Sequence, residues 1–79
     1  MKISELVAHK ELIHRRVGIE VPAGRSTVGV AVDLYRNLGI DVVLEERLIF
    51  VMVGEVLAGP VQAALERRTG VMAFNDWLD

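Results

Sequence analysis

The pattern of apolar and polar residues is clearest in the middle of the chain. Six consecutive apolar residues, Leu48 to Val53, follow the charged triplet Glu45-Glu46-Arg47 and precede Gly54-Glu55. The run is rich in β-branched and aromatic side chains and too short for a helix, so it predicts a buried strand. A second strand is expected over 41–45, joined to the first as a hairpin through the Glu46-Arg47 pair.

Two earlier segments differ in their period. Apolar and other residues alternate strictly from Arg16 to Val21. This alternation predicts a half-buried strand, which Pro22-Ala23-Gly24 ends. Upstream, a 3.6-residue period predicts a helix from Ile3 to His14. The apolar stripe of that helix consists of Ile3, Leu6, Val7 and Ile13.

A second helix is predicted from the Ser26-Thr27 pair to Leu38. Ser26 or Thr27 can cap its start, and Gly39 is well placed to end it in a left-handed conformation. The apolar face of this helix consists of Val28, Ala31, Val32, Tyr35 and Leu38.

A third helix has punctuation at both ends. Pro60 is expected at its first position, Arg67-Arg68 in its last turn, and Gly70 just after it. Its inward-facing residues are expected to be Val61, Ala64 and Leu65.

These elements predict one domain over residues 1–79. The N-terminal helix occupies 1–14, an α+β core occupies 16–70, and an apolar tail, 71–79, could be helix, strand or an ordered extension. Val56-Leu57 is expected to continue or bend the strand before it. The order predicts an α+β fold with a sheet of about three to four strands and helices packed on one face.

Composition adds a constraint on the surface. Of the 79 residues, 52% are hydrophobic, and the mean hydropathy is +0.37. A domain of this size buries only about 60% of the surface of its unfolded chain. The apolar content therefore exceeds what one small core can hide, and an exposed apolar patch that meets a partner or a second copy is expected.

Charge and residue content exclude several classes. The net charge is −2 and the nine basic residues are scattered, which is unlike a nucleic-acid-binding stripe. The chain has no cysteine, so disulfides and thiolate metal sites are excluded and a reducing cytoplasm is the expected location. No apolar run is long enough for a membrane span, and no membrane association is expected.

Candidate chemistry is sparse. Glu11 and His14 have the Glu-x-x-His spacing of di-iron ligands, but a di-iron site needs a second such motif and two more carboxylates. Glu5 and His9 could complete only a surface metal site. No hydroxyl residue has a convincing histidine and acid beside it. We therefore expect no catalytic residues, no metal and no cofactor.

Several segments, in one order from Val17 to Leu78, resemble the small effector (coupling) proteins of soluble di-iron multicomponent monooxygenases of the methane, phenol and toluene type. That range is about three-quarters of the chain. The matching segments are Val17-Gly18, Ala23-Gly24, Leu44-Glu45-Glu46-Arg47, Phe50-Val51-Met52-Val53, Gly54-Glu55-Val56-Leu57, a helix ending near Gly70, and Phe74-Asn75 with Asp76-Trp77-Leu78.

The resemblance implies a cofactor-free regulatory subunit that docks on an oxygenase component near its di-iron site. Such a protein biases the conformation of the hydroxylase and couples electron delivery to turnover. The candidate partner-facing residues are Glu45, Glu46, Arg47, Phe50 and Trp77, some of which must also belong to the core.

Three alternatives compete with this function. A β-grasp sulfur carrier needs a C-terminal Gly-Gly for adenylation, and the ending Trp77-Leu78-Asp79 disfavours it. A self-assembling structural protein would form a homo-oligomer, with the strand Leu48–Val53 as an edge-to-edge contact. A small enzyme built on Glu11 and His14 would contain bound metal after purification.

Overall fold

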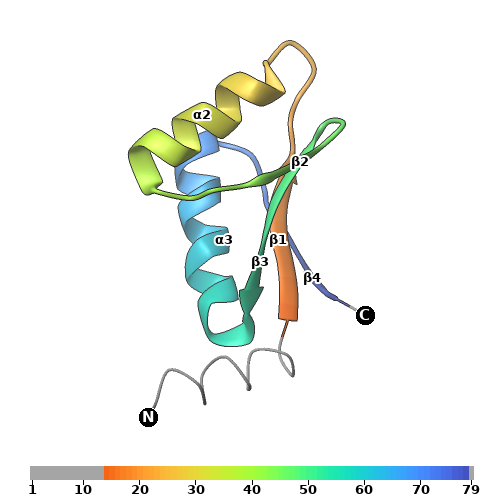
Figure 1. The fold of residues 1–79 in the computed structure, drawn as a ribbon, viewed down its shortest axis with the longest axis vertical. Helices are drawn as coiled ribbons and strands as arrows, with labels where there is room; N and C mark the ends of the chain where they lie inside the picture. The colour runs from red at the N-terminus through yellow and green to blue at the C-terminus, as the bar shows by residue number, and fades with distance from the viewer. Residues whose placement is uncertain (1–13, 79) are drawn as a thin grey trace.

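The computed structural model describes residues 14–78, which form a four-stranded sheet and two helices (Figure 1). The α+β class and the placement of the helices on one face of the sheet are confirmed. The elements are β1 (His14–Glu20), α2 (Thr27–Leu38), β2 (Val43–Glu45), β3 (Leu48–Gly54), α3 (Glu55–Thr69) and β4 (Phe74–Trp77).

The sheet is antiparallel throughout, with the strand order β2-β3-β1-β4. Each helix connects two strands that lie apart in the sheet, with another strand between them. This β-α-β-β-α-β order is the split β-α-β, or ferredoxin-like, arrangement. It leaves one face of the sheet under the helices, the other face open, and β2 and β4 at the two edges.

The core lies between the sheet and the helices, and alternation along β1 builds it as predicted. Val17, Ile19 and Val21 are at most 2% exposed. The helices each add a leucine, Leu34 from α2 and Leu65 from α3. The remaining members of the core cluster are Ile49, Ala58 and Ala73, with a shell of partly buried valines and Ile40.

The helix ends follow the sequence signals. The Ser26 hydroxyl accepts a hydrogen bond from the Gly29 N–H at 3.0 Å and so caps α2. Gly39 and Gly70 take left-handed conformations after α2 and α3, with φ of 67° and 73°. The two-residue turn of the β2–β3 hairpin is also confirmed at Glu46 and Arg47.

The start of α3 differs from the prediction. The helix begins at Glu55, so Val56 and Leu57 are helical and do not continue β3. Gly54 has the extended backbone of an N-cap, and the Glu55 carboxylate in the first turn suits the positive end of the helix dipole. Pro60 therefore lies inside the helix, where its missing N–H removes the bond to the Val56 carbonyl.

The remaining predicted boundaries differ from those of the structure or lie outside the described residues. The predicted tail contains β4, which pairs with β1 in a register that places Phe74 opposite Gly18. The strand expected over 41–45 is only Val43–Glu45. His14, expected to end a helix, begins β1. The rest of the predicted N-terminal helix, with Glu5, His9 and Glu11, lies outside the described residues.

The absence of a side chain on Gly18 allows β1 to pair closely with β3 at Phe50. A Cβ on Gly18 would overlap the Ile49 carbonyl oxygen and lie 2.5 Å from the Cβ of Phe50. Phe50 on β3 and Phe74 on β4 both lie opposite Gly18 in the register, so the two rings flank the glycine.

We predict that Gly18→Ala destabilises the domain by about 3 kcal/mol, because the added methyl group overpacks the sheet against backbone atoms. Gly59→Ala is the matched control, since nothing lies within 4 Å of its Cβ and alanine is favoured in helices by about 1 kcal/mol. Urea unfolding of the two variants measures both effects. Equal stability of Gly18→Ala and the unmodified protein would contradict this packing.

Candidate protein-binding surface

The apolar face predicted for α2 forms, but most of it lies at the surface. Val28, Val32 and Tyr35 are 62%, 43% and 61% exposed, whereas Leu34 on another side of the helix is completely buried. A partly exposed ion pair joins a neighbouring side of α2 to α3, where the Arg68 guanidinium contacts the Asp33 carboxylate at 2.7 Å. α2 is therefore apolar on two sides, and only the side that contains Leu34 faces the core, which the periodicity of the sequence did not indicate.

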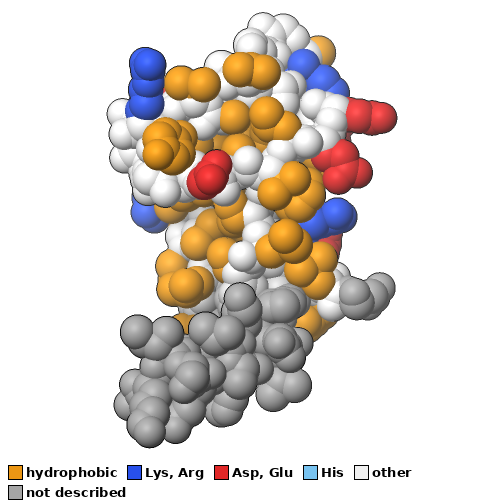
Figure 2. Space-filling model, viewed as in Figure 1, with side chains coloured by type: hydrophobic (Ala, Val, Ile, Leu, Met, Phe, Trp, Pro, Cys, Tyr) orange, Lys and Arg blue, Asp and Glu red, His pale blue; other side chains and the backbone are white. Residues whose placement is uncertain are grey.

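The exposed side of α2 faces the edge strand β2 across an open groove of about 270 Å³. Val42 and Leu44 form the wall opposite the helix, and Leu44 is 46% exposed. We call Val28, Val32, Tyr35, Val42 and Leu44 the α2–β2 surface. Figure 2 shows hydrophobic side chains gathered on this face of the molecule, across the level of α2 and the chain beside it.

A second hollow continues the apolar surface along β3. β2 pairs with β3 only over Leu48–Phe50, so Val51 and Met52 extend beyond the end of β2. The hollow has a volume of about 420 Å³. Its lining residues are Ile40, Asp41, Val43, Val51, Met52, Val53 and Val61. Asp41 lines both hollows, which places a carboxylate between two apolar areas.

The structure does not bring the five predicted partner-facing residues into one site. Glu45 and Glu46 are exposed around the β2–β3 turn. Phe50 is 6% exposed on the open face of the sheet, and Trp77 is 56% exposed near the end of β4. The Arg15 guanidinium lies over the Trp77 ring, 4.3 Å from its centre.

Arg47 has a structural role that its position in a turn did not reveal. Its guanidinium donates to the carbonyl oxygens of Val21, Pro22 and Arg25, at 3.0 Å for Val21 and Arg25. The Val21 N–H in turn donates to the Arg47 carbonyl at 2.7 Å. Arg47 therefore ties the hairpin to the loop between β1 and α2.

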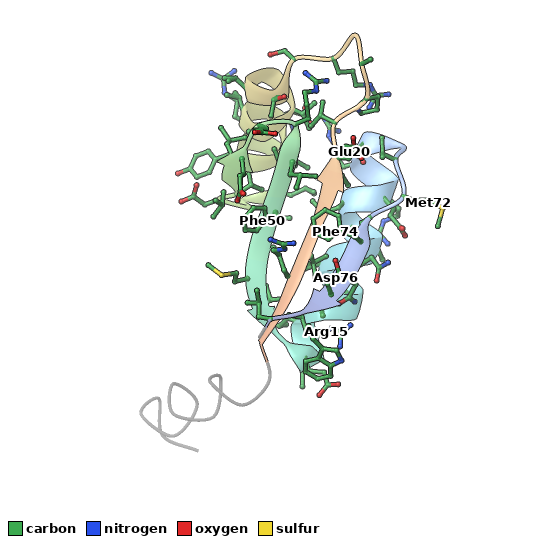
Figure 3. All side chains as sticks on the ribbon, turned by 90° about the vertical axis from the view of Figure 1, so that its right-hand side faces the viewer. Arg15, Glu20, Phe50, Met72, Phe74 and Asp76 are labelled. Atoms are coloured by element: carbon green, nitrogen blue, oxygen red, sulfur yellow. The ribbon has the colours of Figure 1, made fainter. Side chains whose placement is uncertain are left out.

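The open face of the sheet is covered by its own side chains. The Arg16 guanidinium lies over both aromatic rings, 5.1 Å from the centre of Phe50 and 5.8 Å from that of Phe74. Figure 3 looks onto this face and shows Glu20 and Asp76 beside the two rings. Cation–π contacts hold the arginine there, and they leave little aromatic surface for stacking on a ligand.

Polar contacts between α3, β1 and β4 hold β4 in place. The Gln62 side chain donates to the Ala73 carbonyl at 3.0 Å and accepts from the Asn75 amide at 3.1 Å. Arg15 donates to the Asn75 carbonyl at 2.8 Å. Within residues 14–78, no group of three or more His, Cys, Asp or Glu residues could hold a metal ion.

The Asp33–Arg68 pair shifts the pKa values of both of its groups. The hydrogen bond from Arg68 lowers the pKa of the Asp33 carboxyl and raises that of the guanidinium. A lowered folded pKa means that the contribution of Asp33 to stability is present at neutral pH and is lost as pH falls through that pKa. Both groups are solvent-exposed, so the pair orients the helices more than it stabilises them.

No protein-family model, curated protein or solved structure matches this chain. Among the described helices, neither α2 nor α3 is long and apolar enough to cross a membrane.

We predict that Arg47→Met destabilises the domain by about 2 kcal/mol, because three carbonyl oxygens lose a charged donor. Glu45→Gln, an exposed change in the same hairpin, is the control and should alter the free energy of unfolding by less than about 0.5 kcal/mol. Denaturant titration distinguishes the two. A fully stable Arg47→Met protein would return Arg47 to the set of partner-facing candidates.

Proposed function

We propose that this chain is a non-catalytic regulatory protein that docks on a larger protein, an oxygenase component, and modulates its activity. The exposed apolar side of α2 is the observation that carries the proposal. Three large apolar side chains of one helix lie in solvent beside a groove and an edge strand. Monomeric domains rarely expose such contiguous apolar area unless it meets a partner.

The resemblance of Val17–Leu78 to monooxygenase effector proteins supports the choice of an oxygenase component as the partner. An effector of this kind acts without chemistry of its own. It binds one conformation of the larger enzyme more tightly than another and so shifts the population towards that state. The cytoplasm, where such soluble oxygenases work, is the proposed location.

The docking surface supported by the fold differs from the residues favoured by the resemblance. Of those five, Glu45 and Glu46 adjoin the α2–β2 surface through β2, and they are retained as partner-facing candidates. Phe50 is covered by Arg16, and Arg47 is occupied with backbone carbonyls. Trp77 lies on the opposite edge strand and would belong to a separate contact.

Self-assembly is the competing function. Its expected contact, the strand Leu48–Val53 as a sheet edge, is available only in part. β2 covers Leu48–Phe50, whereas Val51–Val53 extend beyond the end of β2 on that side. A homo-oligomer would also have to bury the α2–β2 surface. Sedimentation of the purified protein measures this, and the proposal expects a monomer.

We expect Val32→Glu to weaken partner binding at least about tenfold, since it places a charge in the apolar contact. Val32 is 43% exposed, so the substitution leaves the core intact. Val56→Glu is the control, because Val56 is 81% exposed at the start of α3 and does not line the groove. Tagged proteins are recovered gently from the native host, and the co-purifying chains are identified and quantified by mass spectrometry.

Recovery of a hydroxylase by the unmodified and Val56→Glu proteins, but not by Val32→Glu, would support the proposal. Adding the unmodified protein to that hydroxylase should then change substrate-coupled reductant consumption. Recovery of the chain alone, as a fixed oligomer, would contradict the proposal and leave self-assembly as the better account.

A further inference from the structure

The outer edge of β2 presents backbone groups that the sheet does not use. A two-residue turn joins β2 to β3, and Glu45 pairs with Leu48 and Val43 with Phe50. Hydrogen-bonded pairs recur at every second residue of an antiparallel ladder, starting beside such a turn. Val43 and Glu45 therefore point their N–H and C=O groups towards β3, and Leu44 points its own outward. Among residues 14–78, no strand lies on that side of β2.

The groove beside this edge has the form of a strand-binding site. One wall is the exposed side of α2, with Val28, Val32 and Tyr35. The other wall is β2 itself, whose Leu44 contributes both a groove-lining side chain and the outward backbone groups. A strand added to a sheet edge is held by main-chain hydrogen bonds, and its alternate side chains enter pockets on one side. The groove lies between α2 and the free edge of β2, as such a binding mode requires.

We propose that an extended segment of the partner protein adds to β2 as a fifth strand. Its main chain pairs with Leu44, and its alternate apolar side chains enter the groove between α2 and β2. This inference rests on the proposed protein-binding role and names the surface and the kind of segment that it takes.

Charge at the ends of the groove indicates which end of the bound segment carries a basic residue. Glu45 and Glu46 are exposed at the turn, where the added strand would end or begin. A lysine or arginine at that end of the segment would meet two carboxylates. At the other end, Arg36 and Asp41 both line the groove, so the local charge is balanced. The partner segment is therefore alternately apolar and basic at the end that lies beside the turn.

The same charges disfavour a second copy as the occupant. Two β2 strands that paired antiparallel about Val43 would place Glu45 opposite Asp41 of the other copy, and this would occur twice. Pairing about Leu44 would place Glu45 and Glu46 opposite valines of the other copy, so the carboxylates of both copies would have no basic partner. Like charges directly opposite one another destabilise a strand pair. A foreign strand with a basic residue avoids this repulsion.

The test uses a phage-displayed library of random nonapeptides, selected on the full-length protein. We expect enriched sequences with apolar residues at alternate positions and a lysine or arginine towards one end. When a synthetic peptide of the enriched sequence is added, the backbone amide of Leu44 should shift in NMR spectra and become protected from hydrogen exchange. The amides of β4, on the other edge, should remain unchanged.

Two variants separate strand addition from simple apolar contact. Leu44→Pro removes the outward N–H together with the Leu44 side chain, at an edge position where proline is tolerated. It is compared with Leu44→Ala, which shortens the side chain and keeps the N–H, and it should bind the peptide about tenfold more weakly than Leu44→Ala. Val32→Glu changes the opposite wall and should weaken binding to a similar degree. Val56→Glu is the control and should bind the peptide as the unmodified protein does. Unchanged amide spectra of β1 and β3 would verify that each variant is folded.

Strand addition is overturned if no peptide is enriched, if the peptide protects β4 or the open face, or if Leu44→Pro binds it no more weakly than Leu44→Ala. A homodimer that protects the Leu44 amide without peptide would also overturn it, in favour of a second copy. None of these peptide results decides whether the protein docks on a hydroxylase, because the co-purification experiment tests that role separately. A partner recovered by Leu44→Pro but lost from Val32→Glu would retain the role and reject the added strand.

Discussion

Burial of Leu34 against the sheet determines how the rest of α2 is presented. Leu34 is completely buried among Val17, Ile19, Ile49 and the other core residues. Once it is inserted, the Asp33–Arg68 pair holds the neighbouring side of α2 towards α3. Side chains on a helix that lie on the far side of such an anchor cannot reach the same core. Val28, Val32 and Tyr35 are therefore left in solvent by the same packing that stabilises the helix.

Side chains of the domain itself cover the aromatic rings on the open face of the sheet. Gly18 lets Phe50 and Phe74 pack over β1, and Arg16 then covers both rings. The open face is consequently occupied by contacts within the domain. The edge of β2 is different, because this strand is only three residues long and a groove lies beside it. Apolar surface and available backbone groups coincide there, which is why we place the contact with a partner on this side.

Local signals were sufficient to predict much of the fold. Alternation gave β1 and its three buried residues, the apolar run gave β3, and Ser26, Gly39 and Gly70 gave helix ends. The start of α3 was mispredicted because Pro60 resembles a first helical residue, while the true start depends on the extended backbone of Gly54 and on Glu55. β4 could not be assigned because Phe74–Trp77 is a strand only through its pairing with β1.

The candidate surface was harder to predict than the fold. Composition indicated that an apolar patch would be exposed, but it could not say where. α2 carries apolar residues on two sides, and the periodicity alone favoured the wider one, around Val32, as its apolar face. The core takes the narrower side, with Leu34 buried and Val30 packed against the core cluster. This choice depends on contacts with residues that are distant in the sequence, which no local pattern reveals.

The most direct test is solvent accessibility of the α2 side chains in solution. A soluble gadolinium chelate broadens the NMR signals of methyl groups near the protein surface. We expect strong broadening of the Val28 and Val32 methyl signals and little broadening for Leu34. Protected Val28 and Val32 methyls in the free monomer, together with an exposed Leu34, would contradict this account of α2 and of the surface that it presents.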